Sequence, residues 1–369
     1  MNLHSDAQTL RRLAGFFVIV GAVAALASCT NSSGLLYKHQ LRTPLQCPCP
    51  TIAPLAAYTM PAEVPFGSNA YIGGITTGPD NNVWVTEFDA AKIARVTENG
   101  TVTEFPLLAA GAGPGIITTG PDGNLWFTDY NLSSIWRITT AGTITQFPLP
   151  PPFTTTPSNL NGIAPGPDGN IWFVDGDADV VGVMSTSGTL LKTYQIPTPN
   201  PYNPLTFSGY ATFITAGPDG NMWFVEEAAS KIGRIALPSG TITEFSTPTP
   251  NCVPKNLVVG ADGNMWFPER DCGQIARITP SGVITEFQVT TAPASILLRR
   301  ITSTPDGNLW FIQAAHAPPW TQSEVGEMNT AGVGTNLWSF PNGWPQGLAT
   351  GPDGSPWFTD EANDTVVRL

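Results

Sequence analysis

The sequence predicts an all-β protein, a seven-bladed β-propeller of four-stranded blades. The stretch at residues 120–129, GPDGNLWFTD, returns along the chain at intervals of 42 to 51 residues. Further strand-like segments follow each copy, and four short strands at this period are typical of a propeller blade. The Asp of the turn marks the copies at Asp80, Asp122, Asp168, Asp219, Asp262, Asp306 and Asp353.

The first two strands of each blade are predicted from the repeated stretch itself. In Pro-Asp-Gly-Asn, Pro presets φ, the Asp side chain can accept a hydrogen bond from the backbone N–H two residues on, and Gly accepts a positive φ. The apolar run after it, such as residues 125–127, has the character of a buried strand. Each blade therefore begins with a hairpin.

The third and fourth strands come from two further recurring segments. The third is found at residues 92–97, 134–139, 231–235 and 274–279, and the fourth at residues 100–105, 142–147, 240–245 and 282–287. The chain stops at residues 365–369, which match a third strand. Residues 55–61 have the spacing of a fourth strand, so we expect the N-terminal segment to complete the last blade and to remove its exposed edge.

The N-terminal region has the features of a targeting segment and a tether. Arg11 and Arg12 precede an uncharged run that is short for a membrane span. Residues 26–29, Leu-Ala-Ser-Cys, resemble a bacterial lipobox, which implies lipidation at Cys29, and Thr30 resembles the outer-membrane pattern. We therefore divide the chain into a lipoprotein signal peptide (1–28), a Pro- and Ser-rich tether (29–54) and the propeller (55–369). The alternative is an ordinary signal peptide and a secreted protein.

Composition limits the partners. The formal net charge is −12 and only 12% of residues are charged, so there is no basic footprint for nucleic acid. We expect a monomer of the bacterial cell envelope, in the outer membrane or periplasm, that touches the membrane only through its lipid anchor.

The five cysteines fit an oxidising compartment. With Cys29 lipidated, four remain. Cys252 precedes the first strand of blade 5 and Cys272 follows its second strand, and these two ends share one rim. We predict a disulfide between Cys252 and Cys272, whereas the pairing of Cys47 and Cys49 stays open.

The repeats resemble the virginiamycin B lyase (streptogramin B lyase) family. The resemblance rests on residues 117–129, 231–235 and 240–245 and extends over residues 55–369. It implies a seven-bladed propeller that opens a cyclic depsipeptide by Mg-assisted elimination. It also implies catalytic His residues in a Pro-His-x-Ile pattern at the start of the last two blades, and a Glu on either side of the last-blade His.

This chain departs from that pattern at three of the four positions. The two His positions hold Gln346 and Arg299, and Trp344 stands at the preceding acidic position. Only the later carboxylate has a counterpart, in Asp360 or Glu361, which are the candidate ligands for Mg or Ca. Gln cannot shuttle a proton, and Arg stays protonated.

Only three His are present, and the signal and tether account for His4 and His39. His316, in a long loop of blade 6, is the candidate for a relocated base. A solvated loop His is the alternative.

An acidic residue follows Trp-Phe in nearly every blade. Two roles are open for this set: a carboxylate ring that holds Mg or Ca, or a structural role such as pairing with the Arg95-type residue or a backbone N–H. The set is Glu87, Asp129, Asp175, Glu226, Glu269 and Asp360, with Gln313 as the exception.

Residues outside the repeat are the candidates for binding. Four Trp are not part of it: Trp136, Trp320, Trp338 and Trp344. Aromatic groups with a few polar ones on a rim can stack on sugar or peptide faces, although each can also simply pack. The candidate ligand-binding residues are Tyr71, Tyr210, Arg299, Arg300, Trp320, Trp344 and Gln346.

Two functions follow from the sequence. The first is a non-catalytic module that binds a small molecule, glycan or peptide. The alternative is an enzyme, either a Mg-dependent carbon–oxygen lyase or a lactonase, with a rearranged site. No Ser-His-Asp or Cys-His arrangement is evident.

Overall fold

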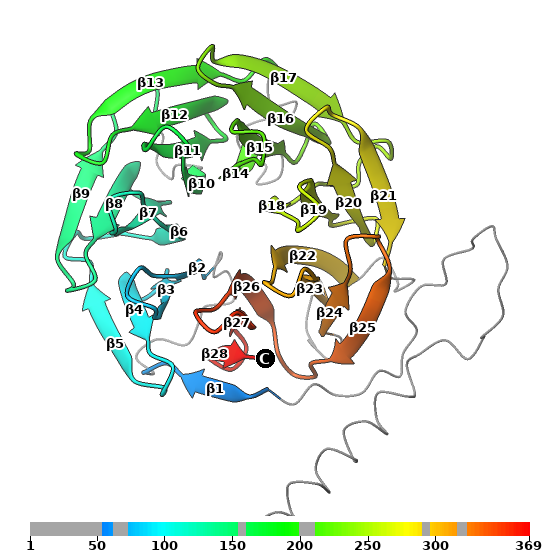
Figure 1. Cartoon of the computed structure of the whole chain (residues 1–369). Coiled ribbons are helices and arrows are strands. Elements are labelled where there is room, and N and C mark those ends of the chain that lie inside the picture. The colour runs from blue at the N-terminus through cyan, green and yellow to red at the C-terminus, as the bar shows by residue number, and fades with distance from the viewer. Residues whose placement is uncertain (1–53, 62–72, 154–159, 199–210, 290–295, 316–322) are drawn as a thin grey trace, which may run out of the picture.

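The computed structural model describes residues 54–61, 73–153, 160–198, 211–289, 296–315 and 323–369. In these ranges all regular elements are strands, which form seven four-stranded antiparallel sheets around one axis (Figure 1). The predicted seven-bladed propeller is therefore confirmed. The expectations for residues 1–53, including Cys29, Cys47 and Cys49, lie outside the described ranges. A search of those ranges finds no helix long and apolar enough to cross a membrane.

Blades 1 to 6 run from an innermost to an outermost strand in chain order, whereas blade 7 takes its outermost strand from the N-terminal side of the propeller. Blades 1 and 2 are β2 (Ile75–Thr77), β3 (Val83–Glu87), β4 (Lys92–Val96), β5 (Val102–Pro106) and β6 (Pro114–Thr119), β7 (Leu125–Asp129), β8 (Ser134–Ile138), β9 (Ile144–Pro148). Blades 3 and 4 are β10 (Leu160–Pro165), β11 (Ile171–Asp175), β12 (Val180–Met184), β13 (Leu190–Gln195) and β14 (Ala211–Ala216), β15 (Met222–Glu226), β16 (Lys231–Ala236), β17 (Thr241–Ser246). Blades 5 and 6 are β18 (Val258–Val259), β19 (Met265–Glu269), β20 (Gln274–Ile278), β21 (Ile284–Gln288) and β22 (Ile296–Ser303), β23 (Leu309–Ala315), β24 (Glu324–Met328), β25 (Gly334–Ser339). Blade 7 is β26 (Pro345–Thr350), β27 (Pro356–Asp360), β28 (Thr365–Arg368) and β1 (Ala56–Thr59).

The N-terminal strand closes the ring, as expected. β1 pairs with β28, so that Tyr58 lies opposite Val366. The Tyr58 ring stacks on Trp357 with ring centroids 5.5 Å apart, in the place that a fourth-strand Phe takes in other blades. Both ends of the propeller are thus held in one sheet, and β1 covers the edge of β28.

The repeated turn fixes the repeated Trp. In blade 2, Asp122 accepts a hydrogen bond from the Asn124 backbone N–H at 3.3 Å and from Trp126 Nε1 at 2.9 Å. The Trp126 ring lies on Gly120, where a Cβ would come within 2.4 Å of the ring. The motif therefore needs Asp to satisfy a buried indole and Gly to make room for it.

The recurring Arg of the third strand does not pair with the acid that follows Trp-Phe. Of the two structural partners expected from the sequence, the Arg95-type residue is therefore wrong. Arg137 is 3.9 Å from the turn residue Asp122 and stacks over Trp126 and Phe147. It also donates to the Thr186 carbonyl of the next blade at 3.0 Å. The strand register explains the difference, because it places the third-strand Arg opposite the Trp.

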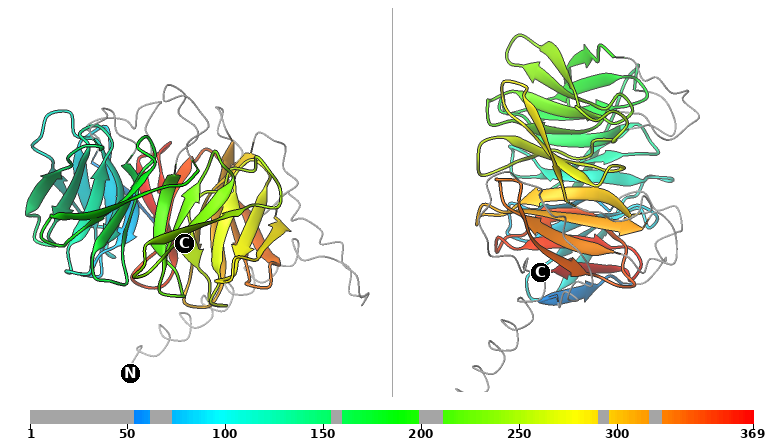
Figure 2. Two further views of the ribbon diagram at one scale, coloured as in Figure 1. Left: turned by 90° about the horizontal axis from the view of Figure 1, so that it is seen from above. Right: turned by 90° about the vertical axis from the view of Figure 1, so that its right-hand side faces the viewer.

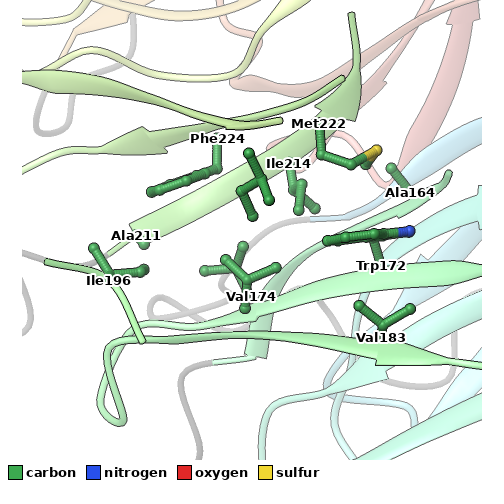
Figure 3. Close-up of a cluster of buried hydrophobic side chains, with 11 residues drawn as sticks. Ala164, Trp172, Val174, Val183, Ile196, Ala211, Ile214, Met222 and Phe224 are labelled. Carbon is green, nitrogen blue, oxygen red and sulfur yellow. The ribbon is translucent and has the colours of Figure 1, made fainter. Parts of the chain in front are cut away.

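The core lies between neighbouring blades. Trp172 and Val174 of blade 3 face Ile214, Met222 and Phe224 of blade 4 (Figure 3), and buried clusters of the same kind join other neighbouring blades. The two side views show the blades standing beside one another around the ring (Figure 2). Fully burying one such side chain contributes roughly 1.5–3 kcal/mol. Each blade is therefore stabilised mainly by its neighbours.

Cys252 and Cys272 form a disulfide with their Cα atoms 5.1 Å apart, which is the pairing expected from their positions. It joins the segment before the short strand β18 to the loop after β19. That segment is also tied to blade 5 by the bridge between Pro254 and Glu269 and by backbone hydrogen bonds, such as that from the Arg270 N–H to the Val253 carbonyl at 3.0 Å.

Candidate functional site

The candidate site lies on the rim where the chain reaches the first strand of each blade and leaves the second. We call it the front rim. The Pro-Asp-Gly-Asn turns lie on the opposite rim, because each of them joins the other ends of the same two strands.

Two positions of the repeat form the front rim near the axis. The first lies seven residues before the turn Asp, as Arg299 does before Asp306, and the second lies eight residues after it, as Glu361 does after Asp353. The first position holds Gly73, Gly115, Asn161, Thr212, Lys255, Arg299 and Gln346. The second holds Phe88, Tyr130, Gly176, Glu227, Arg270, Ala314 and Glu361.

A β-bulge turns the first position away from the regular strand. In blade 6, Leu298 pairs with Gln313 and Arg300 with Ile312, which leaves Arg299 as the extra residue. In blade 7 the register shifts between Pro345 and Leu348, around Gln346. The same shift occurs in blades 2, 3 and 4. Bulges commonly re-aim a side chain next to a functional site.

The two positions that hold His in the family contact one another here. Arg299 Nη1 donates to Gln346 Oε1 at 3.3 Å, and the Arg299 guanidinium lies 5.2 Å from the centroid of the Trp344 ring. Gln346 is 8% exposed. The structure therefore brings together four of the predicted ligand-binding residues, since Arg300 is adjacent in β22.

Glu361 is the carboxyl beside this pair. It is 6% exposed, and burial raises its pKa to about 8, while Arg299 and Gln346 oppose the rise. Asp89 and Asp360 raise the pKa further. The Gln346 amide lies near the carboxyl, although neither Glu361 oxygen has a partner at full hydrogen-bonding geometry. Glu361 is thus a buried carboxyl of the site whose pKa lies close to neutral pH.

Asp360, by contrast, is held by hydrogen bonds from N–H groups. It accepts hydrogen bonds from the backbone N–H of Trp344 at 2.7 Å and of Ala362 at 3.2 Å, and from Asn363 Nδ2 at 2.6 Å. Its side chain therefore holds the loop after β27 to the start of β26. Burial raises its pKa in spite of these bonds.

These two residues do not fit a Mg²⁺ or Ca²⁺ centre. Hard cations need several oxygen ligands, yet Asp360 is bonded to N–H groups and Glu361 stands beside a guanidinium. Within the described ranges no group of three or more His, Cys, Asp and Glu side chains is placed to hold a metal.

Four of the other acids after Trp-Phe interact with groups of the following turns or of the outermost strands. Asp129 and Asp175 accept hydrogen bonds from backbone N–H groups of the turns that follow them. Glu226 and Glu269 lie near Glu244 and Glu286 of the outermost strands, and burial raises the pKa of both to about 8. The hydrogen bonds of Asp129 and Asp175 support a structural role for these acids, in which the carboxylate accepts from backbone N–H groups.

Sequence reasoning missed the charged residues of blades 4 and 5. Glu227 accepts from the Thr212 hydroxyl at 2.6 Å and forms an ion pair with Lys255. Arg270 pairs with Asp271 at 2.6 Å. The signal was available, because these residues hold the same two repeat positions as Arg299 and Glu361.

The remaining predicted aromatic and His residues either lie outside the described ranges or pack within their own blades. Tyr71, Tyr210, His316 and Trp320 lie outside the described ranges. Trp338 stacks on Trp310 with ring centroids 5.3 Å apart. Trp136 Nε1 donates to Asp129 Oδ2 at 3.0 Å, so these two Trp are bound into their blades.

No protein-family model matches the chain, and no curated protein matches it. Solved structures do. A streptogramin B lyase structure is 27% identical, with 85% of this chain and 96% of that chain covered and a TM-score of 0.71. Virginiamycin B lyase from Staphylococcus aureus is 30% identical, with coverages of 85% and 97% and a TM-score of 0.69.

A catalytically inactive variant of the S. aureus enzyme with quinupristin is also 30% identical, with coverages of 85% and 98% and a TM-score of 0.68. The likeness spans nearly the whole of each enzyme and includes all seven blades of the propeller. The chain therefore belongs to the virginiamycin B lyase family.

Proposed function

We propose that this protein is a non-catalytic member of the family, which binds a small molecule, glycan or peptide at its front rim. The single observation that carries the proposal is the hydrogen bond between Arg299 and Gln346. It occupies both positions at which the family has a catalytic His.

Neither residue can serve as a base. A Gln amide does not take up a proton, and the Arg299 guanidinium, whose pKa burial lowers to about 10, stays charged at neutral pH. Their mutual bond and the stacked Trp344 ring give a packed polar surface in place of a proton-transfer pair.

We place the protein in the bacterial cell envelope, as a monomer anchored by a lipid at Cys29. The support is the sequence of residues 1–29 and the disulfide between Cys252 and Cys272, which suits an oxidising compartment. Secretion without an anchor is the alternative.

A second candidate is a lyase or lactonase with a rearranged site. Glu361 favours it, because a buried carboxyl with a pKa of about 8 is matched to proton transfer near neutral pH. In this reading Glu361 takes the role of base.

A turnover assay separates the two. The full chain is incubated with quinupristin, with Mg²⁺ and with EDTA, and products are followed by chromatography and mass spectrometry. The S. aureus enzyme serves as the positive control. We expect no product from a cooperatively folded protein.

A linear product of unchanged mass would indicate elimination, and one heavier by a water would indicate hydrolysis. Either product, if lost in Glu361→Gln, would overturn the binding proposal and favour the enzyme. If no product forms, glycan and peptide arrays with the same protein identify the ligand class.

A further inference from the structure

Positive charge gathers at one part of the front rim in an otherwise acidic protein. Most of the Lys and Arg residues in the described ranges take part in contacts that recur from blade to blade. Five Arg stack on the recurring Trp, and Lys92 and Lys231 form ion pairs with acids of the outermost strands. Of the five other described cations, Lys192 is exposed on β13. The remaining four form what we call the cationic cluster: Lys255, Arg270, Arg299 and Arg300.

The members of the cluster come from adjacent blades and repel one another. Burial is the main cause that lowers the pKa of Arg299, and the positive charge of Arg270 lowers this pKa further, so the two guanidinium groups stand close enough to interact. Lys255 is likewise near Arg300 and Arg270. Two of the four have close acidic partners, Glu227 for Lys255 and Asp271 for Arg270.

Arg300 has no such partner among the described residues. It is 9% exposed, yet no described carboxylate lies within 4 Å of its guanidinium. Its one hydrogen bond is a long contact of 3.4 Å to the Arg299 carbonyl. A buried charge without a directly paired carboxylate is costly, so this guanidinium is suited to bind an anion.

The position of Arg300 is fixed by an aromatic ring. Its guanidinium lies 4.4 Å from the centroid of Phe213, in β14 of blade 4. Arg300 belongs to β22 of blade 6, and Figure 1 shows the short strand β18 of blade 5 between β14 and β22, so this contact joins two blades that are not neighbours. The stack holds the group in place before any ligand arrives, which lowers the entropy cost of binding.

The nearby acids do not cancel this charge. Glu227 is the carboxyl that acts most on Arg300, but it is already paired with Lys255. Glu361 acts on both Arg299 and Arg300, and its raised pKa keeps much of it neutral at pH 7. The pKa of Arg300 is lowered to about 10 by burial, so it remains charged. The cluster therefore keeps a net positive charge at neutral pH.

We propose that Arg299 and Arg300 bind an oxyanion of the ligand, a carboxylate or a phosphate, at the centre of the front rim. A guanidinium matches either group with two parallel N–H donors. The inference rests on the proposed function, since it names the chemistry that the binding rim recognises.

The test is calorimetric titration of the full chain with sodium phosphate and, separately, sodium acetate, at constant ionic strength set with sodium chloride. We expect at least one of the two anions to bind and to raise the melting temperature. Arg300→Gln should weaken that binding at least tenfold. Lys192→Gln removes the same charge from β13 and should leave it unchanged.

Arg300→Lys is a second variant that keeps the charge and loses the paired donors, and it should bind with intermediate affinity. Binding of neither anion to the wild-type protein, or equal loss in Lys192→Gln, would overturn the inference. Stabilisation of the wild-type protein by phosphate or acetate, but not by chloride, tests the site even if Arg300→Gln does not fold.

Failure here is distinguishable from failure of the proposed function. Turnover of quinupristin with anion binding intact would remove only the non-catalytic role. Absence of both turnover and anion binding would leave a binding module whose ligand is recognised by other groups.

Discussion

Arg299 Nη1 donates a hydrogen bond to Gln346 Oε1 at 3.3 Å, across the boundary between blades 6 and 7. The two residues hold equivalent positions in their blades, each at a bulge of the first strand. Gln346 also lies beside Glu361, so it stands between a guanidinium and a carboxyl. Replacing either partner alone would leave a buried polar group with a lost bond.

Arg299→Gln should raise the pKa of Glu361 above about 8. Arg299 is the cation that holds this pKa down, while burial, Asp89 and Asp360 push it up. The titration of the Glu361 carboxyl is measured by ¹³C NMR, with Lys192→Gln as the charge-matched control. An unchanged or lower pKa would show that Arg299 does not act on Glu361.

Asp122→Ala should lower the free energy of unfolding by about 1–3 kcal/mol, because it leaves the buried Trp126 indole without its acceptor. Asp306→Ala is the matched control. Asp306 holds the same turn position but bonds to Thr304 and Asn308, and no Trp310 bond to it is formed. Denaturant unfolding compares the two, and an equal loss in both would mean that the indole bond to Asp122 contributes no more than the Thr304 hydroxyl bond to Asp306.

Reduction of the disulfide, or the double variant Cys252→Ala and Cys272→Ala, should destabilise the propeller by roughly 3 kcal/mol. The reason is that the cross-link restricts the unfolded chain, which gains entropy when a loop of this length is opened. The local effect should fall on blade 5, whose first strand is short. Hydrogen exchange of β18 and β19 measures it. Faster exchange spread evenly over all blades would contradict a local role.

The fold could be predicted because each blade repeats chemistry that is local in sequence. The Asp of the turn, the Gly under the ring and the Trp above it act within seven residues, as in residues 120–126. The expectation that failed depended on strand register. Trp84 lies opposite Arg95, whereas Glu87 lies opposite Lys92, so the Arg reaches the turn Asp80 and not the acid after Trp-Phe.

The site could be predicted only in part. Family positions led to Arg299 and Gln346, but the contact of Arg300 with Phe213 joins blades 4 and 6 and follows no sequence spacing. Glu227 and Lys255 belong to blades 4 and 5, whereas the family pattern concerns only the last two blades. The side chains of the front rim also depend on bulges, which leave no period in the sequence.

Cys29→Ser should move the protein from the membrane fraction to the soluble envelope fraction. The prediction follows from the lipobox-like residues 26–29, since thioether attachment of lipid needs the Cys sulfur. Fractionation of cells with immunoblotting measures it, and Cys47→Ser in the tether is the control. Membrane association that survives Cys29→Ser would exclude a lipid anchor at this residue.

The stability of the propeller should fall as pH rises from about 5 to 8. Burial raises the pKa of Glu269 from 4.5 to about 8, helped by Glu286, and does the same for Glu226 near Glu244. Between these values the folded protein keeps a proton that the unfolded chain releases, so each group lowers the free energy of unfolding by up to about 1.4 kcal/mol per pH unit.

Glu269→Gln removes one of these titrating carboxyls. The free energy of unfolding should then fall less steeply with pH, by the contribution of one group. Glu98→Gln is the control, because the Glu98 side chain is 63% exposed. Urea unfolding at pH 5.5, 6.5 and 7.5 measures both. The turn Asp residues whose pKa is lowered, such as Asp219, lose their stabilising effect only below about pH 4, outside this window. Stability that rises between pH 5.5 and 7.5 would mean that the buried carboxyls are ionised and find partners in the folded protein.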